Sequence, residues 1–360
     1  MEWYEIKNIE KVDSPSLVLY EHLFENNLEK MIGLVNGDVN RLMPHVKTNK
    51  CQKVIERMVE SGITRFKAAT IAEAKLAAQA KAKFVLIAHQ LVGPKIDKFF
   101  SLKEQFPKTT FALLVDNLQS ASELKKSKPL QKVYIDINSG MNRSGIEPGD
   151  NLASLMKYID QEPNIVLAGF HVYDGHIHDK SYNEKQKKVT KGMEAIQAYI
   201  MELMKLNPDA EVIAGGTPSF TVHNQNPEVI CSPGTCVFWD WGYNENIPEQ
   251  PFDPAALLVT RIISKPKEGI VTVDLGHKAL AAENPIQKRV LFLNIGAYEL
   301  LSQSEEHGVL KVKNWEKFRI GDVIYGIPYH ICPTVNLHRE IGVIKNGILS
   351  EHWKTIAGER

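Results

Sequence analysis

Eight short apolar segments, rich in β-branched residues, alternate with stretches of helical periodicity from the first fifty residues of the chain to about residue 237. Strands that alternate with helices normally pair side by side in a parallel sheet. Eight such units favour a closed (β/α)8 barrel of the TIM type over an open Rossmann sheet. The predicted strands are Arg41–Pro44, Phe66–Ala69, Phe84–Ala88, Thr110–Val115, Lys132–Ile137, Ile165–Val172, Glu211–Gly215 and Glu228–Cys231.

The segments between these strands carry the start signals of helices. Thr70 is followed three residues later by Glu73, which is the spacing of a capping box. Pro94 suits the first turn of a helix, and Asn117 suits a cap. Helices are therefore expected at Cys51–Ser61, Ile71–Ala80, Lys95–Leu102, Leu118–Lys126, Leu152–Asp160 and Tyr182–Leu206, with a further one at Leu23–Val35 before the barrel.

The character of the sequence changes beyond about Val237, because short β-branched runs follow one another with few helical periods between them. This pattern predicts a mainly antiparallel β domain, which we expect the strand-like segment Ser16–Tyr20 to join. The predicted domains are a barrel over residues 24–237 and a β domain formed by residues 1–23 and 238–360. The predicted strands of this domain are Ala256–Ser264, Ile270–Asp274, Val290–Gly296, Tyr298–Ser302, Val309–Val312, Val323–Ile327 and Glu340–Lys345.

Composition excludes several classes of protein. Lys and Arg together number 43, as do Asp and Glu, so the zero net charge gives no electrostatic case for nucleic acid or an anionic membrane surface. Four scattered cysteines are too few for a disulfide framework and favour reduced thiols. The acidic start of the chain does not read as a signal peptide, and no apolar run approaches the roughly 18–20 residues that span a bilayer. We therefore expect a cytoplasmic protein.

Chemistry in a (β/α)8 barrel takes place at the carboxyl ends of the strands, so the polar residues just beyond each predicted strand are the natural candidates. Lys47 follows the first strand. A lysine in this position can form a Schiff base over the barrel mouth, which is the usual way to anchor pyridoxal phosphate (PLP). Taken alone, a solvated loop lysine is the commoner alternative. The other polar loops are Asn138–Gly145, Tyr173–Asp179, Gly215–Ser219 and Ser232–Thr235.

Two of these loops have compositions that suit an anionic, planar cofactor. Gly215, Gly216 and Thr217 form a phosphate-cradle sequence, since glycines let backbone N–H groups approach an anion. A plain turn is the alternative. Arg143, held in a tight glycine-flanked loop, could favour the ionised phenolic oxygen of PLP, or could be a surface arginine in an ion pair. Tyr173 could stack on or hydrogen-bond to a planar ring, or be an ordinary half-buried tyrosine.

Histidines supply two further candidates. His176 and His178 are two residues apart, so in extended chain they face the same way and could act as acid and base or line a metal pocket. Each could equally be a satisfied polar residue. In the β domain, His330 and Cys332 would also share one face if their segment were a strand. Imidazole and thiolate together favour zinc, and two protein ligands would leave positions open for catalysis, although an isolated His-x-Cys often arises by chance.

Taken together and in this order, the motifs resemble the D-threonine aldolase / D-serine dehydratase family of fold-type III (alanine racemase-like) PLP enzymes, over nearly the whole chain. This family's lysine motif usually has a histidine where this chain has Asn49. The segments that carry the resemblance are Pro44–Lys50, Ala69–Ala74, Asn138–Gly145, Gly169–His178, Gly215–Ser219, Pro233–Thr235, Asp274–Leu280 and Pro328–Asn336.

The resemblance implies roles for particular residues. Lys47, in a motif with His45, would hold PLP as an internal aldimine. Arg143 would meet the O3′ atom of PLP and Tyr173 its pyridine ring. The phosphate would rest on Gly215, Gly216 and Thr217. A divalent metal, zinc or manganese, would bind His330 and Cys332 and grip the β-hydroxyl of the substrate. The family is commonly dimeric, with the β domain of one subunit closing the barrel of the other.

The expected function is therefore a PLP- and metal-dependent lyase acting on β-hydroxy-D-amino acids, by dehydration of D-serine or 3-hydroxyaspartate or by retro-aldol cleavage of D-threonine. Cys332 resembles the dehydratases, whereas the aldolases usually carry aspartate there. Aldolases also have a histidine where this chain has Asp179, so His176, His178 and Asp179 are all candidate bases. An amino-acid racemase and a non-catalytic PLP carrier are the alternatives, although carriers of this type lack a β domain.

Overall fold

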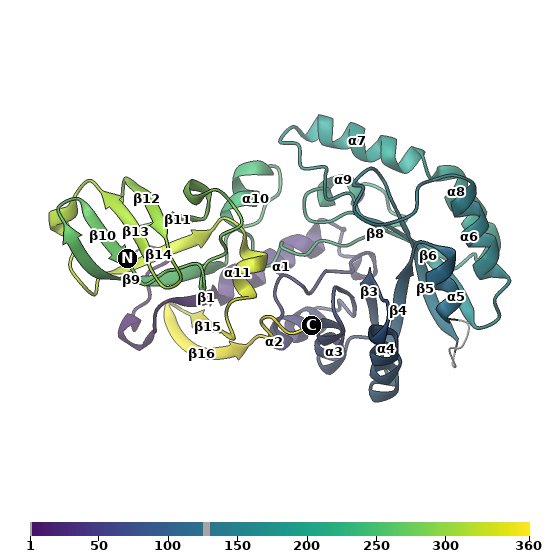
Figure 1. The fold of residues 1–360 in the computed structure, drawn as a ribbon, viewed down its shortest axis with the longest axis horizontal. Helices are drawn as coiled ribbons and strands as arrows, with labels where there is room; N and C mark the ends of the chain where they lie inside the picture. Colours follow the sequence, from purple (N-terminus) through teal and green to yellow (C-terminus); the bar gives the residue numbers. More distant parts are fainter. Residues whose placement is uncertain (1, 125–129) are drawn as a thin grey trace. The chain divides into compact units, whose positions relative to one another are not determined.

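The computed structural model of this protein describes residues 2–124 and 130–360. It divides into two compact units. The β unit comprises residues 2–31, 48–53 and 235–359, and the barrel unit comprises residues 32–47, 54–124, 130–234 and 360. Figure 1 labels the helices and strands of both units.

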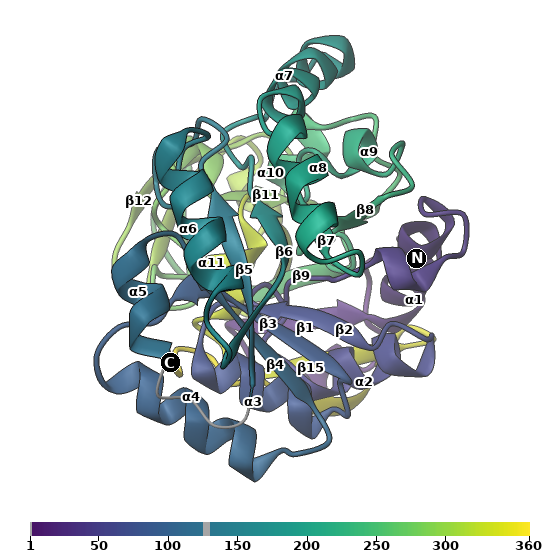
Figure 2. The same cartoon turned by 90° about the vertical axis from the view of Figure 1, so that its right-hand side faces the viewer.

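The barrel unit contains seven parallel strands, which pair with one another in chain order (Figure 2). Helices cover their outer side, so the fold class predicted from the sequence is confirmed. The strands are β2 (Arg65–Ala68), β3 (Phe84–Gln90), β4 (Thr110–Val115), β5 (Gln131–Ile137), β6 (Ile165–Val172), β7 (Glu211–Ala214) and β8 (Val229–Cys231).

The predicted first strand, Arg41–Pro44, is not a regular strand. Residues 42–46 instead close the barrel through isolated parallel bridges, from Leu42 to Cys231 of β8 and from His45 to Lys67 of β2. Pro44 explains the irregularity, because it has no N–H to donate to a ladder. Its carbonyl still accepts from the Lys67 N–H at 2.9 Å. The segment thus takes the eighth position of the barrel and delivers Lys47 just beyond it.

The barrel interior is filled by a layer of apolar side chains from alternate positions of the strands, among them Met43, Leu86, Ala112, Leu114 and Ile213. Burial of the larger side chains of this layer, such as those of leucine, isoleucine and methionine, contributes roughly 1.5–3 kcal/mol each relative to exposure. This packed layer supports the polar residues at the carboxyl ends of the strands.

Helices α2 (Gln52–Glu60), α3 (Ile71–Gln79), α4 (Pro94–Gln105), α5 (Leu118–Glu123) and α6 (Asp150–Asp160) connect the strands as expected. Thr70 accepts from the Glu73 N–H at 3.1 Å and Asn117 from the Ser120 N–H at 2.8 Å, so both predicted caps are confirmed. The predicted end of α5 at Lys126 lies outside the described residues.

The predicted single helix Tyr182–Leu206 is two helices, α7 (Tyr182–Glu194) and α8 (Gln197–Leu206). Ile196 leaves the helical conformation at φ −110° and ψ 1°, and its side chain is fully buried. The apolar periodicity continues across this break, so the pattern alone does not reveal it. A short helix α9 (Phe220–His223) follows β7.

The β unit has one nine-stranded, mostly antiparallel sheet and helix α1 (Glu21–Gly33). Strand β1 (Ser16–Tyr20) pairs antiparallel with β9 (Ala256–Lys267) and parallel with β15 (Glu340–Lys345). The predicted membership of Ser16–Tyr20 in this sheet is therefore confirmed. The remaining strands are β10 (Ile270–Val273), β11 (Val290–Phe292), β12 (Tyr298–Gln303), β13 (Gly308–Val312), β14 (Val323–Pro328) and β16 (Ile348–Lys354).

Strand β16 is not among the strands predicted above. It forms a hairpin with β15 through Asn346 and Gly347, both of which have positive φ, at 54° and 74°. Asn-Gly is the preferred pair for such two-residue turns, and it is the sequence signal that would have revealed the hairpin.

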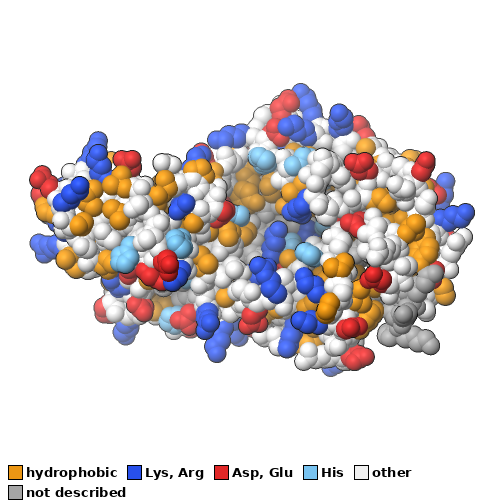
Figure 3. All heavy atoms as spheres, viewed as in Figure 1, with side chains coloured by type: hydrophobic (Ala, Val, Ile, Leu, Met, Phe, Trp, Pro, Cys, Tyr) orange, Lys and Arg blue, Asp and Glu red, His pale blue; other side chains and the backbone are white. Residues whose placement is uncertain are grey.

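Side chains of both charges are interspersed over the face shown in Figure 3, in keeping with the balance of acidic and basic residues. In the two described ranges, every helix is too short or too polar to pass through a lipid bilayer.

Candidate active site

A cavity of about 420 Å³ opens at the carboxyl ends of the strands in the barrel unit. Its volume falls in the range of ordinary small-molecule sites. It brings together four residues predicted from the sequence, namely His45, Lys47, Arg143 and Tyr173. The remaining lining residues are Lys67, Ala69, Ala88, His89, Gln90, Ser144 and His171.

The ring of Tyr173 is the focus of three cationic side chains. The distances from its centroid are 4.8 Å to Arg143 Cζ, 5.5 Å to Lys67 Nζ and 5.8 Å to Lys47 Nζ. Such positions over an aromatic face are favourable for cations. Basic side chains therefore gather around one ring of the cavity, which suits an anionic ligand.

Glycines allow this ring to lie close to the backbone. A Cβ atom added at Gly216 would lie 2.8 Å from Tyr173 Cε2, and one at Gly175 would collide with the Tyr173 hydroxyl. A larger residue at either position would have to displace the ring.

Gly216→Ala is expected to displace the Tyr173 ring and to lower the free energy of unfolding by roughly 1–3 kcal/mol, the usual effect of overpacking. Urea denaturation measures this change. Gly192→Ala is the matched control, because its nearest neighbour outside its own helix is Ser139 Cβ at 3.9 Å and alanine favours a helix. Equal stability of the two variants would show that the ring does not need this glycine.

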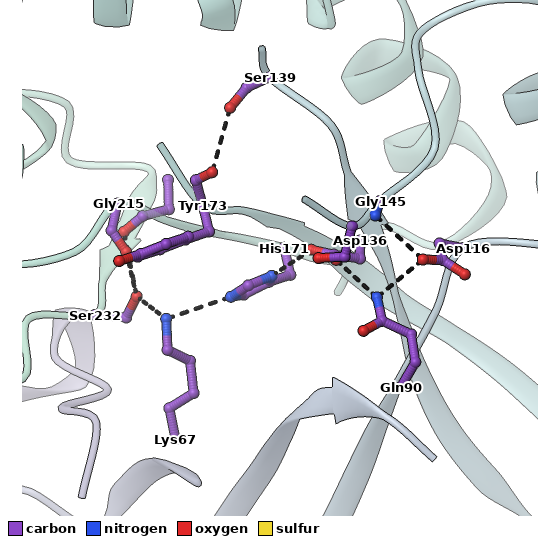
Figure 4. A network of polar contacts seen from close by, with 12 residues as sticks. Lys67, Gln90, Asp116, Asp136, Ser139, Gly145, His171, Tyr173, Gly215 and Ser232 are labelled. Carbon is purple, nitrogen blue, oxygen red and sulfur yellow. Dashed lines mark hydrogen bonds and ion pairs between the residues drawn. The ribbon is translucent and has the colours of Figure 1, made fainter. Parts of the chain in front are cut away.

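A network of polar side chains lies deeper in the barrel (Figure 4). Lys67 Nζ donates to Ser232 Oγ at 2.6 Å and lies 3.3 Å from His171 Nε2. His171 Nδ1 in turn lies 2.7 Å from Asp136 Oδ1. Burial lowers the pKa of Lys67 to about 7, and the positive charge of Lys47 acts in the same direction.

Asp136 is the anion of this network. Burial acts to raise the pKa of its carboxyl, but hydrogen bonds from His171, Gln90 and Ser144 outweigh burial and lower the pKa. Burial and the nearby Lys67 lower the pKa of His171, so its imidazole is neutral. A neutral His171 therefore donates from Nδ1 to the Asp136 carboxylate and presents a lone pair at Nε2 to Lys67.

The glycine loop after β7 (Gly215–Ser219) is held by a second buried carboxylate. Asp174 accepts from Ser219 Oγ at 2.6 Å and from His223 Nε2 at 2.7 Å. Burial opposes ionisation of Asp174, but these two hydrogen bonds lower its pKa. Gly215 has φ +74°, where glycine is favoured, and a Cβ there would lie 2.6 Å from His223 Cδ2.

The loops after β7 and β8 are joined by a hydrogen bond from the Gly234 N–H to Thr217 Oγ1, at 3.0 Å. Gly215, Gly216 and Thr217 do not line the 420 Å³ cavity. Gly216 nevertheless influences the cavity, because its Cα faces the ring of Tyr173, which does line the cavity.

The three candidate bases lie apart from this cavity. The segment after Tyr173 turns rather than extending, with the Ile177 N–H donating to the Asp174 carbonyl. The expected extended chain through His176 and His178 is therefore wrong. Both histidines are exposed on either side of the buried Ile177.

Asp179 is engaged elsewhere on the barrel unit. Its carboxylate pairs with Lys188 of α7 at 2.7 Å, and this hydrogen bond lowers its pKa. His176 Nε2 faces Gly140 of the arginine loop (Asn138–Gly145, which carries Arg143), since a Cβ at Gly140 would lie 3.3 Å from it. His176 therefore lies beside the arginine loop, whereas the ion pair with Lys188 holds Asp179 against α7.

The residues of the barrel unit fit PLP. A positive cavity of suitable volume holds a primary amine at Lys47, an arginine at its rim and a backbone that glycines leave open beside Tyr173. Lysine supplies the amine that carbonyl cofactors require, and the cations complement phosphate.

His330 and Cys332 do not lie in a strand, so that expectation is wrong. Cys332 lies in the first turn of helix α11 (Ile331–Val335), and His330 precedes the helix in extended conformation. Pro333 suits this turn, since an N–H there would have no helical partner. The buried Asp240 accepts from the Ile331 N–H at 3.0 Å and so fixes the start of the helix.

The two side chains nevertheless face each other. A hydrogen bond between them raises the pKa of His330 to about 9 against the opposing effect of burial. Burial raises the pKa of Cys332, but the bond to His330 outweighs it, so that the net shift is downward. His330 Nδ1 also lies 2.8 Å from Glu283 Oε1, and Cys332 Sγ lies 3.1 Å from Thr48 Oγ1.

This pair fits a divalent metal in the chemistry of its donors. Imidazole and thiolate are ligands that zinc prefers, and a carboxylate partner on the other imidazole nitrogen is typical of metal-bound histidine. Among residues 2–124 and 130–360, no cluster of three or more His, Cys, Asp or Glu side chains could hold a metal. A metal on this pair would therefore keep several positions for water or substrate.

Lys67, Gln90 and His171 also line the cavity, although no sequence motif predicted them. Lys67 and His171 lie within predicted strands, where a polar side chain is costly to bury without a partner. Their presence in otherwise apolar strands of a barrel was the available signal. Gln90 lies beyond the predicted end of its strand at Ala88.

Comparison with known proteins agrees with this geometry. Residues 22–239 match the family model described as the alanine racemase N-terminal domain, and residues 255–344 match the putative serine dehydratase domain. The first match alone spans more than half of the chain.

Individual relatives are similar over nearly their whole length. The chain is 25% identical over 358 residues to a D-threonine aldolase from Arthrobacter sp, covering 96% of this chain and 93% of the relative. It is 21% identical over 352 residues to a D-threo-3-hydroxyaspartate dehydratase from Delftia sp. strain HT23, covering 90% and 92%.

The crystal structure of D-threonine aldolase from Filomicrobium marinum superposes with a TM-score of 0.87 at 26% identity, covering 98% of this chain and 97% of that one. With both domain matches in order and these relatives covered almost completely, the chain belongs to the D-threonine aldolase / D-serine dehydratase family of fold-type III, alanine racemase-like PLP enzymes.

Proposed function

We propose that this protein is a PLP-dependent lyase that acts on β-hydroxy-D-amino acids with the help of a divalent metal. The observation that carries the proposal is the positive cavity at the barrel mouth, where Lys47, Arg143 and Tyr173 converge. The relatives named as an aldolase and a dehydratase for such substrates support it.

Within this proposal, Lys47 is the residue that attaches PLP covalently. Arg143 supplies positive charge to the phenolic oxygen, and Tyr173 meets the pyridine ring. Gly215, Gly216 and Thr217 hold the phosphate. His45 supports Lys47 directly, because its Nδ1 accepts from the Lys47 N–H at 3.3 Å. Burial and the charge of Lys47 keep the pKa of His45 well below its ordinary value, so the ring stays neutral and accepts this bond.

When bound, PLP supplies an electron sink for the electrons of the bond that breaks at the substrate Cα. Dehydration requires a base for the Cα proton, and the Lys47 amine is our candidate. Carbon–carbon cleavage requires a base for the β-hydroxyl proton. His176 and His178 remain the candidates for that base, whereas the ion pair with Lys188 makes Asp179 the weakest of the three.

The proposed metal ligands are His330 and Cys332, with zinc as the preferred ion and manganese as the alternative. Such an ion would act as a Lewis acid on the β-hydroxyl in either reaction. The cysteine at position 332 favours dehydration over cleavage, because among the family's enzymes it is the dehydratases that carry cysteine there.

We also propose that the protein is a cytoplasmic homodimer. The family resemblance supports the dimer, and light scattering coupled to size-exclusion chromatography would measure it. Cys231 and Cys332 carry thiols rather than disulfide bonds, as is usual in a reducing compartment.

The decisive experiment is incubation of the PLP-loaded, metal-loaded protein with D-threonine and with D-serine. We expect glycine and acetaldehyde from cleavage, or a keto acid and ammonia from dehydration, and no turnover of the L-enantiomers. Racemised amino acid as the sole product would replace the lyase with a racemase. Absence of any reaction with a protein that binds PLP would support the carrier instead.

A further inference from the structure

Lys67 is a second lysine at the cofactor cavity, and neither the proposed chemistry nor the family resemblance stated above uses it. It lies on β2, lines the cavity, and is only 2% exposed. A buried lysine is costly unless its ammonium is hydrogen-bonded. The partners of Lys67 therefore indicate what it does.

The hydrogen bonds around Lys67 have a consistent direction. His171 donates from Nδ1 to Asp136, so its Nε2 must accept, and Lys67 Nζ lies 3.3 Å away as the donor. Ser232 Oγ donates to the Gly215 carbonyl at 2.8 Å and accepts from Lys67 at 2.6 Å. Lys67 Nζ therefore donates one hydrogen bond to His171 on β6 and one to Ser232 in the loop after β8.

One arm of this network leads to the arginine loop. Asp136, which His171 holds, accepts from Ser144 Oγ at 2.9 Å and from Gln90 Nε2 at 2.8 Å. The same Gln90 amide donates to Asp116 at 3.0 Å, and Asp116 accepts from the Gly145 N–H at 3.1 Å. Ser144 and Gly145 directly follow Arg143, so these bonds fix the loop that aims the guanidinium.

The other arm leads to the glycine loop. Ser232 holds the carbonyl of Gly215, whose neighbour Gly216 lies against the Tyr173 ring. The Tyr173 ring also lies beside this lysine, with its centroid 5.5 Å from Nζ. Figure 4 shows the ammonium between Ser232 and His171, with the Tyr173 ring alongside.

We propose that Lys67 is a positioning residue of the cofactor site, whose ammonium ties the arginine loop to the glycine loop across the barrel and supports the Tyr173 ring between them. This inference rests on the proposed function in so far as the cavity holds PLP. Lys67 acts through Arg143, Tyr173 and the glycine loop rather than by reacting itself.

The rival role for Lys67 is covalent attachment of PLP in place of Lys47. The geometry opposes it, because two N–H groups of Lys67 are committed within the buried network. No hydrogen bond or ion pair is found for Lys47 Nζ within the two described ranges, and this amine lines the same cavity. Borohydride reduction of the PLP-loaded protein tests this rival role directly.

The test compares Lys67→Met with Lys75→Met, which makes the same substitution on the exposed face of α3. Methionine fills a similar volume without charge, so Lys67→Met should fold, as the melting temperature of the cofactor-free protein will report. We expect its dissociation constant for PLP to rise roughly ten- to hundred-fold, the usual effect of losing charged hydrogen bonds. The visible absorption maximum of bound PLP should also shift.

These readouts separate positioning from a purely structural role. A lysine that only stabilises the fold would change the melting temperature and leave the affinity and the absorption maximum of PLP at the values of the Lys75→Met control. That result would overturn the proposal. If Lys67→Met fails to fold, Ser232→Ala removes one arm only, and we expect it to weaken PLP binding about two- to tenfold. Unchanged affinity in Ser232→Ala would then contradict the proposal.

Borohydride reduction of the wild type distinguishes failure of this inference from failure of the proposed function. PLP recovered on the Lys67 peptide would overturn both the positioning role and the assignment of Lys47. PLP recovered on Lys47, with normal affinity in Lys67→Met, would overturn the positioning role alone. PLP recovered on Lys47 with weakened affinity in Lys67→Met is the expected result.

Discussion

Lys47→Ala should abolish covalent attachment of PLP and lower lyase turnover by roughly 10³–10⁶-fold, the range seen when a covalent catalytic residue is removed. The reason is that Lys47 is the cavity amine that the buried network leaves available. Borohydride reduction followed by mass spectrometry of the peptide that contains residue 47 measures attachment directly. The visible absorbance of the bound cofactor should disappear in parallel.

Two controls make this result specific. Lys75→Ala, on the exposed face of α3, should retain both the absorbance and the turnover. Lys47→Ala should keep its melting temperature within a few degrees, because Lys47 is only partly buried. A colourless wild-type protein that fails to bind added PLP would contradict the whole assignment.

Cys332→Ala should remove the metal-dependent part of the reaction while sparing the cofactor. Loss of one of two protein ligands is expected to weaken metal binding at least about 10–100-fold, as even second-shell changes do. Turnover should fall by a similar or larger factor when metal is limiting. Isothermal titration with zinc and elemental analysis of the purified protein measure the binding, and the visible spectrum reports PLP independently.

The matched control for this prediction is His307→Ala, because His307 is an exposed histidine of the same β unit. It should bind metal and turn over substrate like the wild type. Treatment of the wild type with a chelator should reproduce the Cys332→Ala phenotype, and added zinc should restore the wild type only. Full activity after chelation would remove the metal from the proposed mechanism.

Most of the barrel could be predicted from the sequence because each strand and helix carries a local signal. Strands β4 and β6 have the predicted bounds, and Thr70 and Asn117 cap the helices as expected. Residues that follow the predicted strands were expected at the barrel mouth. Of these, His45, Lys47, Arg143 and Tyr173 do line one cavity. Local patterns of this kind depend on neighbours a few residues apart.

The parts that could not be predicted depend on partners that are distant in sequence. Lys67 contacts His171, which lies 104 positions away, and Ser232, which lies 165 positions away, and no periodicity encodes either pairing. The turn at Cys332 is set by Asp240, 91 positions before Ile331. The alternation of residues around His330 also suits a strand, so the choice of a helix there is made by tertiary contacts.

The pairing of β1 has a consequence for synthesis on the ribosome. Val18 lies between Leu257 and Gly342, so β1 is synthesised long before either of the strands that flank it. Until then its two edges offer open backbone groups to any other nascent strand, a hazard for aggregation. We therefore expect newly made chains to depend on chaperones, and chains stopped before residue 256 to be insoluble unless β1 is removed.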